Sequence, residues 1–477
     1  MDPSSVAIFV GVVVLLIALI LSEVPVAFAL ILSATLGILV TKGSGVASST
    51  VGTLPFNSTS SYSLAVVPLY ILMGSLAAKA GLARDLFDVA HYHMRKLPGG
   101  LAIAGITGCA GFAAVTGSSV ATVASVGRTA IEEMRRHGYD PAFAGGAVAI
   151  AGTLGILIPP SVVLVLFGIV TGTSIGSLLI AGIIPGILSA LAYGGVVLFL
   201  VARDPRLAGQ QSRDKAIEVP SARGGASGRI PHQVPLQLAP GAADGEQTLD
   251  GGRRRPAPAQ YFSLAKVLLL FGIVVGGVFT GLYTATEAGA IGAVAALVML
   301  FLAKRPKGRR LVEGIDGLVD SARLTSNVFF IVVGGAIFTF FVVSLGVPRA
   351  FAEWAIDLPI PNWLLVVVIL AAMVPLGMIL DSISIVLVFV PIVFPIIEAM
   401  GFNGVWFGIL AVKLIEIGLV TPPVGLNVFV ISASVPDLPA EKVFRGVVPF
   451  LIVDTAVVAL LFGFPDIALF LPNMMRG

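Results

Sequence analysis

The chain has 477 residues, of which 57% are hydrophobic and only 12% are charged. A soluble protein carries about 25% charged residues, and the mean hydropathy of this chain is +1.02. Several apolar runs of 17 or more residues contain no charge, as in 6–22, and helices of that length can span the hydrocarbon core of a bilayer. We therefore predict an all-α polytopic membrane protein.

The same composition excludes several kinds of site. A single cysteine, Cys109, excludes a disulfide framework and a multi-cysteine metal site. The four histidines lie in or beside polar segments, which argues against a buried histidine metal centre. The net charge of +3 is explained by membrane topology, because membrane proteins keep Lys and Arg on the cytoplasmic side. No nucleic-acid partner is expected. No cleavable signal is predicted, since Met1–Ser5 carries no Lys or Arg.

Twelve apolar segments follow in chain order, six on each side of a polar stretch. The first six span 6–22, 25–41, 62–80, 99–134, 141–175 and 178–202, and the last six span 261–281, 284–303, 324–345, 362–399, 404–432 and 444–463. The polar stretch 203–260 is rich in Pro, Gly, Ala, Gln and charge and lacks a periodic apolar face. It is predicted to be a flexible cytoplasmic linker.

The two halves, 1–202 and 261–477, contain matching motifs at nearly one offset, which indicates an internal duplication. The matched pairs are Ser22-Glu23 with Thr286-Glu287, GLARDLF at Gly81 with GVPRAFA at Gly346, GFAAVTGSSV at Gly111 with GMILDSISIV at Gly377, and Pro159-Pro160 with Pro422-Pro423. Each half is therefore predicted to contain the same set of elements in the same order.

Charge placement predicts the topology of these repeats. We place both ends of 99–134 on one side as a re-entrant hairpin and treat 362–399 in the same way. The amphipathic stretches LARDLFDVAHYHMRKL and PRAFAEWAI become arms along opposite membrane surfaces. Nearly all of the 29 Lys and Arg residues then fall on the cytoplasmic face, the exceptions being Lys42, Arg349, Lys413 and Arg476. Each half has five crossings and a hairpin, so the repeats are inverted, as in many secondary transporters.

Polar interruptions recur in both halves, about 45 residues apart in each. The hairpins turn at Thr116-Gly117-Ser118-Ser119 and at Asp381-Ser382-Ile383-Ser384, and the following helices (141–175 and 404–432) break at Pro159-Pro160-Ser161 and at Thr421–Gly425, with Asn427 beyond. Paired prolines free backbone carbonyls, which membranes tolerate only inside protein or at a watery cavity. The alternatives are a simple kink, and hydroxyls that bond their own i−4 carbonyl. The recurrence favours a paired site for a hard cation, with the half-helix N-termini facing an anion.

Ionisable residues at membrane depth are costly and usually functional. Asp381 is the leading candidate, as a cation ligand, with the alternative that tip amides simply satisfy its carboxylate. Lys413 and Glu416 are spaced i, i+3 and are expected to pair, with Glu416 as a second candidate for ion coupling. Trp354, Trp363 and Trp406 fit an aromatic belt at the outer surface. No phosphate loop suggests ATP hydrolysis.

Several motifs together resemble the large membrane subunit of tripartite ATP-independent periplasmic (TRAP) transporters. The matching segments are VPLYILMGSLAAKAGL, GITGCAGFAAVTGSSVATVASVGR, AGTLGILIPPSVVLVLFG, SIGSLLIAGIIPG, GLYTATEAGAIGA, PLGMILDSISIVLVFVPI and IEIGLVTPPVGLNVFVIS. They recur in the family's order and spacing and cover the chain except the linker 203–260, which is longer than the family norm.

This resemblance implies a sodium-coupled, elevator-type importer in a bacterial inner membrane, and not an enzyme. It implies a fold of two inverted repeats, each with a re-entrant hairpin and a discontinuous helix. The implied partners are a small four-helix membrane subunit, a soluble periplasmic substrate-binding protein and the lipid bilayer. The implied substrates are organic anions: C4-dicarboxylates, sialic acid, sugar acids or keto acids.

The resemblance also assigns candidate site residues. One sodium site would use Ser118, Ser119 and backbone between Gly152 and Gly155, and its mirror would use Asp381, Thr421 and backbone near Gly425. The substrate would lie between them, touched by Thr116, Gly117, Ser161, Ser384 and Asn427.

Three other interpretations stay open from the residues alone. A stand-alone divalent-anion/sodium symporter would have similar hairpins but would need no binding protein. An intramembrane enzyme is disfavoured because no paired catalytic residues lie at membrane depth. A channel would have no need of paired mobile hairpins.

Overall fold

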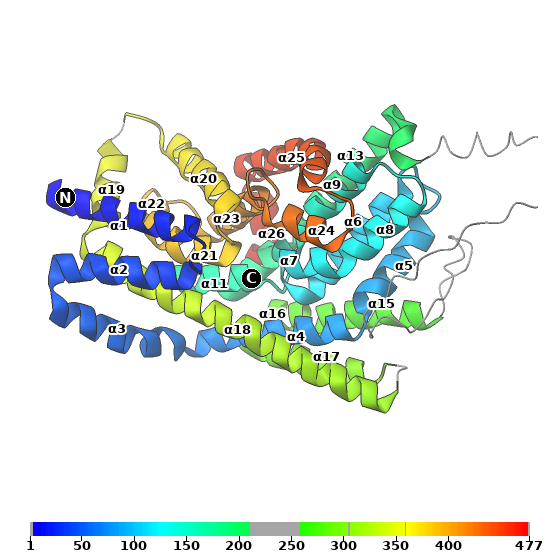
Figure 1. Cartoon of the computed structure of the whole chain (residues 1–477), viewed down its shortest axis with the longest axis horizontal. Coiled ribbons are helices and arrows are strands. Elements are labelled where there is room, and N and C mark those ends of the chain that lie inside the picture. The colour runs from blue at the N-terminus through cyan, green and yellow to red at the C-terminus, as the bar shows by residue number, and fades with distance from the viewer. Residues whose placement is uncertain (1–2, 210–257, 304–305, 358, 476–477) are drawn as a thin grey trace, which may run out of the picture.

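The computed structural model describes residues 3–209, 258–303, 306–357 and 359–475, and this part of the chain is helical with no strand. Most of the predicted linker, 210–257, lies outside the described residues. Its described ends are ordered as helix and turn, because α13 runs to Arg203 and the next helix begins at Pro258. The longest helix, α18 (Lys307–Ser344), runs close to the longest axis of the molecule (Figure 1).

The first half consists of α1 (Pro3–Leu21), α2 (Val26–Lys42), α3 (Ser44–Thr59), η1 (Tyr62–Ala65), α4 (Val66–Lys79), α5 (Leu82–Met94), α6 (Gly100–Thr116), α7 (Ser119–Thr122), η2 (Val123–Gly127), α8 (Arg128–Arg136), α9 (Pro141–Gly152), α10 (Leu154–Leu157), α11 (Val162–Thr171), α12 (Ile175–Ala181), α13 (Ile183–Arg203) and η3 (Pro205–Ala208).

The second half consists of α15 (Pro258–Phe271), η4 (Gly272–Gly276), α16 (Gly277–Phe279), α17 (Ala285–Phe301), α18 (Lys307–Ser344), α19 (Val347–Asp357), α20 (Asn362–Ile379), α21 (Ser382–Val388), α22 (Val390–Ala399), α23 (Gly404–Gly418), α24 (Leu426–Ser434), α25 (Ala440–Gly463) and α26 (Asp466–Met475).

Apolar composition explains why these segments are helical, since a helix satisfies its own backbone hydrogen bonds in lipid. Seven helices of the described chain are long and apolar enough to cross a membrane, or nine if each bent pair counts as one span. One bent pair, Pro141–Leu157 with Val162–Thr171, turns by 44°, and the other, Ser382–Val388 with Val390–Ala399, turns by 56°. The chain is therefore a multi-pass membrane protein.

Both predicted hairpins turn where the sequence places their polar tips. In the first, α6 ends at Thr116 and helix resumes at Ser119. In the second, α20 ends at Ile379 and helix resumes at Ser382. The first turn passes through Gly117 in a left-handed conformation (φ 61°), which glycine adopts without steric cost.

The two amphipathic arms are α5 and α19, and they lie at opposite ends of the long axis (Figure 1). α19 lies near the N-terminus of α1, whereas α5 lies beside α8 at the far end. Both arms follow a tight turn, at Gly81 and Gly346, each with positive φ. This arrangement agrees with the charge count, because α8 carries three arginines and Arg95 and Lys96 directly follow α5, whereas α19 carries a single arginine.

Three helical features depart from the segments expected from sequence. Residues 44–59 form α3 and residues 466–475 form α26, although neither range was expected to be a crossing. The segment 324–345 is the second part of a much longer helix, α18, which has 38 residues.

Trp354 and Trp363 are exposed as an aromatic belt requires. Trp406, however, is buried, and its indole donates to the Leu461 carbonyl over 2.9 Å.

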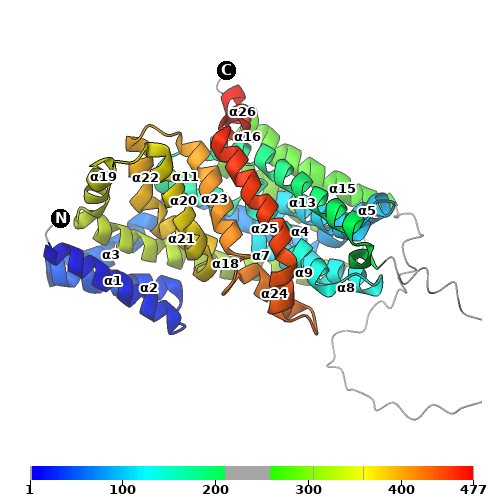
Figure 2. The same ribbon diagram turned by 90° about the horizontal axis from the view of Figure 1, so that it is seen from above.

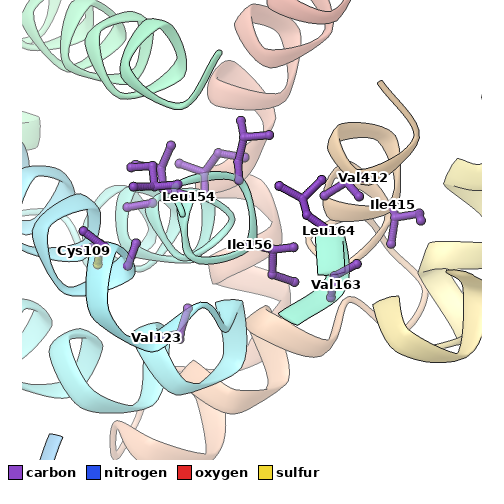
Figure 3. Packing of buried hydrophobic residues seen from close by; sticks show 14 of the residues in the cluster. Cys109, Val123, Leu154, Ile156, Val163, Leu164, Val412 and Ile415 are labelled. Carbon is purple, nitrogen blue, oxygen red and sulfur yellow. The ribbon is translucent and has the colours of Figure 1, made fainter. Parts of the chain in front are cut away.

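The apolar core forms two clusters. The larger surrounds the broken helices, where Ile156 of α10 and Val163 and Leu164 of α11 lie near Val412 of α23 (Figure 3). The smaller joins α1, α2 and α18 through Leu16, Leu30 and Phe341, among others. The larger cluster also includes α4, α15, α17 and the middle of α18, so only α1–α3 and the C-terminal part of α18 form a separate apolar cluster.

Helix α25 covers the broken helices and contacts α9, α13, α23 and α24 (Figure 2). Its closest approach is to α9. A Cβ added to Gly446 would lie 1.8 Å from the Ala142 carbonyl oxygen, and a Cβ added to Gly146 would lie 2.1 Å from the Gly446 carbonyl carbon. Glycine is required at both positions, because the two backbones are in direct contact.

Candidate functional site

The first hairpin tip is held by hydroxyl groups. Ser118 caps α7 by accepting from the Ala121 amide over 3.4 Å, and its carbonyl accepts from the Thr122 hydroxyl over 2.8 Å. Thr116 donates to the Phe112 carbonyl and lies 3.1 Å from the Thr122 hydroxyl oxygen. The tip is therefore ordered by its own side chains, with Ser119 fully buried beneath it.

The first helix break packs directly on this tip. A Cβ on Gly155 would lie 2.6 Å from the Ser118 carbonyl oxygen, and one on Gly117 would lie 2.3 Å from the Pro160 carbonyl oxygen. A Cβ on Gly152 would lie 2.1 Å from Cγ2 of the Val123 side chain. Glycine therefore lets the backbone of the break contact the backbone of the tip. Ser161 is buried and caps α11 by accepting from the Leu164 amide over 3.2 Å.

Asp381 forms the second tip. Its Oδ2 accepts from the Ile383 and Ser384 amides over 3.1 and 3.2 Å, and its Oδ1 accepts from the Ser384 hydroxyl. The carboxylate therefore caps α21, which matches the alternative weighed for it. It also lines a cavity described below, so capping does not remove it from the site.

The second break holds Thr421 and Gly425 next to each other. Thr421 donates its hydroxyl to the Ile417 carbonyl over 2.5 Å, one turn back on its own helix. Gly425 has a φ of 62° and begins α24. No hydrogen bond among the described residues joins either of them to Asp381. Each break contains one cis peptide bond, between its two prolines.

Asn427 joins the two halves of the molecule. Its Nδ2 donates to the Ser119 hydroxyl over 2.7 Å, and the side chain is fully buried. The second break thus reaches the first hairpin tip, a contact that spans 308 residues. Its Oδ1 has no hydrogen-bond partner among the described residues.

The expected pairing of Lys413 with Glu416 is wrong. Glu416 is buried and accepts from the Ser382 hydroxyl over 3.2 Å, and Ser119 lies against the same carboxyl group. Its Oε2 has no partner in the described part of the chain. Glu416 therefore faces both hairpin tips, which keeps it a candidate for ion coupling.

Lys413 instead pairs with Asp454 of α25. Its ammonium also donates to the Tyr193 hydroxyl over 3.0 Å, and that hydroxyl donates to Asp454 over 2.5 Å. Thr153, beside the first break, lies 3.3 Å from the same hydroxyl. This group ties α23 to α13 and α25. The sequence signal for it is a second charge, Asp454, inside an apolar segment.

A cavity of about 460 Å³ lies between the two tips and the α4–α18 pair. Thr116, Gly117, Ser118 and Ser119 line it from the first tip, and Asp381, Ser382 and Ile383 line it from the second. Its opposite wall includes Ser75 and Lys79 of α4 and Asp320 and Arg323 of α18. One space therefore brings both hairpin tips together with charged groups that sequence reasoning did not assign.

Five residues were expected to touch substrate. Thr116 and Gly117 line the cavity. Ser161, Ser384 and Asn427 are buried and do not line it: Ser161 caps α11, Ser384 donates its hydroxyl to Asp381, and Asn427 joins the second break to the first tip. Leu419 and Leu426, which flank the second break, line the cavity.

The ligand atoms that the tips offer fit a hard cation. They are hydroxyl, carbonyl, carboxylate and amide oxygens, which suit such ions better than transition metals. No group of three or more His, Cys, Asp and Glu side chains that could hold a metal occurs among the described residues. The buried oxygens of Glu416 and Asn427 that lack partners leave acceptor capacity beside Ser119.

Comparisons with known proteins find a matching family model and several similar relatives. The model of the family described as "Tripartite ATP-independent periplasmic transporter, DctM component" matches residues 13–467. The C4-dicarboxylate TRAP transporter large permease protein DctM of Pseudomonas aeruginosa is 35% identical over 421 residues, which cover 88% of each chain. The sialic acid TRAP transporter large permease protein SiaM of Vibrio cholerae is 29% identical over 465 residues, which cover 97% of each chain.

A solved structure shares the fold. It is that of the Alcanivorax borkumensis YdaH transporter, with a TM-score of 0.56, 13% sequence identity and 90% coverage of each chain. At this identity the likeness concerns the fold alone.

Proposed function

The chain belongs to the DctM family of TRAP transporter membrane components, a family of transporters and not enzymes, and from this premise we propose that it imports an organic anion together with sodium. The observation that carries the proposal is the single cavity bounded by both hairpin tips and by the α4–α18 pair. Sites between the two repeats are where secondary transporters bind substrate and coupling ions.

The proposed coupling sites are those expected from sequence. Sodium at the first tip is held by Ser118, Ser119 and the backbone between Gly152 and Gly155, and support comes from the direct packing of that backbone on the tip. Sodium at the second tip is held by Asp381, Thr421 and backbone near Gly425. Oxygen ligands of this kind bind hard cations well.

The proposed substrate carries a carboxylate. The P. aeruginosa and V. cholerae relatives are named for C4-dicarboxylates and for sialic acid, both of which are carboxylates. We include sugar acids and keto acids in the class. Thr116 and Gly117 contact substrate directly, whereas Ser161, Ser384 and Asn427 position the elements around it.

The proposed assembly is tripartite. A small four-helix membrane subunit and a periplasmic substrate-binding protein complete it, in a bacterial inner membrane with the linker in the cytoplasm. The hairpins and broken helices slide as one body against α1–α4, α15 and α17–α18. The separate apolar cluster of α1, α2 and the C-terminal part of α18 supports the placement of those helices in the fixed body.

Uptake into proteoliposomes tests the proposal. The chain and its small subunit are reconstituted, an inward sodium gradient is imposed, and labelled organic acids are offered with and without the binding protein. We expect uptake only when both sodium and binding protein are present. Uptake with sodium alone would identify a stand-alone symporter, and flux that needs no gradient and far exceeds carrier rates would identify a channel.

A further inference from the structure

The cavity wall formed by α4 and α18 carries three charged side chains, and two of them neutralise each other. Lys79 Nζ lies 2.8 Å from Asp320 Oδ2, which joins α4 to α18. Both side chains are partly exposed, at 33% and 44%. The Asp320 carboxylate is therefore already engaged by a cation from the neighbouring helix.

Arg323 follows Asp320 by three residues on α18, a spacing at which oppositely charged side chains on a helix can pair. No ion pair or hydrogen bond to its guanidinium occurs among the residues that the structure describes, although it lines the cavity. Lys79 engages the Asp320 carboxylate, so Asp320 does not neutralise the guanidinium of Arg323.

On the facing wall the carboxylate that could reach Arg323 is that of Asp381, which the proposed function assigns to sodium. Asp381 is the carboxylate of the two tips that lines the cavity, and its oxygens accept from Ile383 and Ser384 of its own tip. The remaining polar groups there are the hydroxyls of Thr116, Ser118, Ser119 and Ser382. With Asp381 assigned to sodium, the cavity places the Arg323 guanidinium opposite a row of neutral hydrogen-bonding groups.

We propose that Arg323 binds a carboxylate group of the transported anion from the α18 side of the cavity; this inference rests on the proposed function. Guanidinium matches a carboxylate in a two-point arrangement that an ammonium cannot reproduce. The hairpin tips contact the rest of the substrate through hydroxyls. Because α18 belongs to the body proposed to stay fixed, Arg323 contacts the anion only while the tips lie beside it.

The Lys79–Asp320 pair has a supporting role in this arrangement. By engaging Asp320, Lys79 keeps an acidic group from competing with the substrate for Arg323. Removing the ammonium of Lys79 frees Asp320 to bind Arg323 three residues away, and Lys79→Met is therefore expected to weaken transport in the same direction as loss of Arg323.

Site-directed modification tests the proposal cleanly because the chain has one cysteine, Cys109, which is buried. Arg323→Cys in a Cys109→Ala parent is expected to lower uptake of subsaturating anion about tenfold, the effect of one charge-assisted contact. A methanethiosulfonate reagent carrying an aminoethyl group restores a positive charge but not the two-point geometry, and is expected to restore part of the uptake. A sulfonatoethyl reagent of similar size is expected to restore none.

Arg309→Cys is the matched control, since Arg309 lies on the same helix, pairs with Glu313 over 3.2 Å and does not line the cavity. It is expected to transport like the parent before and after either reagent. The probes are labelled succinate and labelled sialic acid, each with binding protein of matching specificity.

The outcomes distinguish a failure of the proposed function from a failure of the role assigned to Arg323. If the parent moves neither probe nor any acid of a wider panel with sodium and binding protein, the proposed function fails and this inference fails with it. If the parent transports and Arg323→Cys transports equally, or if both reagents or neither reagent restore uptake, only the role of Arg323 is overturned. Rescue by the cationic reagent alone also excludes misfolding as the cause of the loss.

Discussion

At the scale of single residues, Asp381 combines a structural and a proposed ligand role. Its carboxylate caps α21 and faces the cavity. Asparagine keeps an oxygen that can accept the Ile383 and Ser384 amides, so Asp381→Asn is expected to preserve the cap while removing the charge. We expect sodium-stimulated uptake to fall at least tenfold, with the melting temperature lowered by only a few degrees.

The control for this variant is Asp437→Asn, an exposed position with positive φ (61°) that asparagine also tolerates. It removes the same charge far from the tips and is expected to transport normally. Sodium dependence that stays unchanged in Asp381→Asn would remove Asp381 from the coupling site.

The buried Lys413–Asp454 pair makes a prediction about stability. Removing one partner leaves an uncompensated charge in the core, which costs about 3–5 kcal/mol. We therefore expect Lys413→Met and Asp454→Asn each to lower the free energy of unfolding by about that amount in detergent. The double variant is expected to lose much less than the sum, and additive losses would show that the two charges do not interact.

These residues also show where sequence reasoning fails at this scale. A charge inside an apolar segment signals a partner, and Lys413 and Asp454 both give that signal. Spacing along one helix favoured Glu416 as the partner of Lys413, but α25 brings Asp454 closer. Long-range packing decides such a pairing, and a single sequence contains no measure of it. Arg323 was missed for the same reason, because its importance depends on what Asp320 and Lys79 do.

At the scale of elements, the closest contact of the fold lies between α9 and α25. Substituting Gly446 with alanine places a Cβ 1.8 Å from the Ala142 carbonyl, and both helices must shift to relieve the clash. Overpacking of this kind costs about 1–3 kcal/mol. We expect Gly446→Ala to lower the melting temperature of the purified protein and to reduce the amount of folded transporter.

Gly194→Ala provides the matched control, because Gly194 is also helical and no heavy atom lies within 4 Å of the place that an alanine Cβ would occupy there. Its stability is expected to be unchanged or slightly raised, since alanine is the better helix former by about 1 kcal/mol. Equal stability of the two variants would contradict the close α9–α25 approach.

Elements were predictable where two independent patterns agreed. The hairpins follow from matching polar tips in both halves and from the charges at their ends, and the structure turns the chain at Gly117 and before Ser382. α3 was not predicted, because its mixed sequence of Ser, Gly and Thr lacks a strong apolar signal. α26 was not predicted either, since its ten residues are too few to cross a membrane. Contacts with neighbouring elements, which no local pattern encodes, position both helices.

At the scale of the whole molecule, the fold class and the duplication followed from composition and motif order. The relative motion of the two bodies is the proposal that sequence patterns support least directly. The contact that such motion must break lies between α18 and the second hairpin, where a Cβ on Gly335 would lie 3.0 Å from the Leu387 Cβ. One residue earlier on α18, a Cβ on Gly334 would lie 3.1 Å from the Leu30 Cβ of α2, which is a contact inside one body.

These two contacts give a matched pair of cross-links. Both have a Cβ separation slightly under the usual range for a disulfide, so a small shift permits each bridge. In a Cys109→Ala parent, oxidised Gly335→Cys/Leu387→Cys is expected to stop sodium-driven uptake, and reductant is expected to restore it. Oxidised Gly334→Cys/Leu30→Cys is expected to transport in both conditions, because the bodies still slide. Full uptake by the first pair while cross-linked would mean that transport proceeds without movement of the second hairpin against α18.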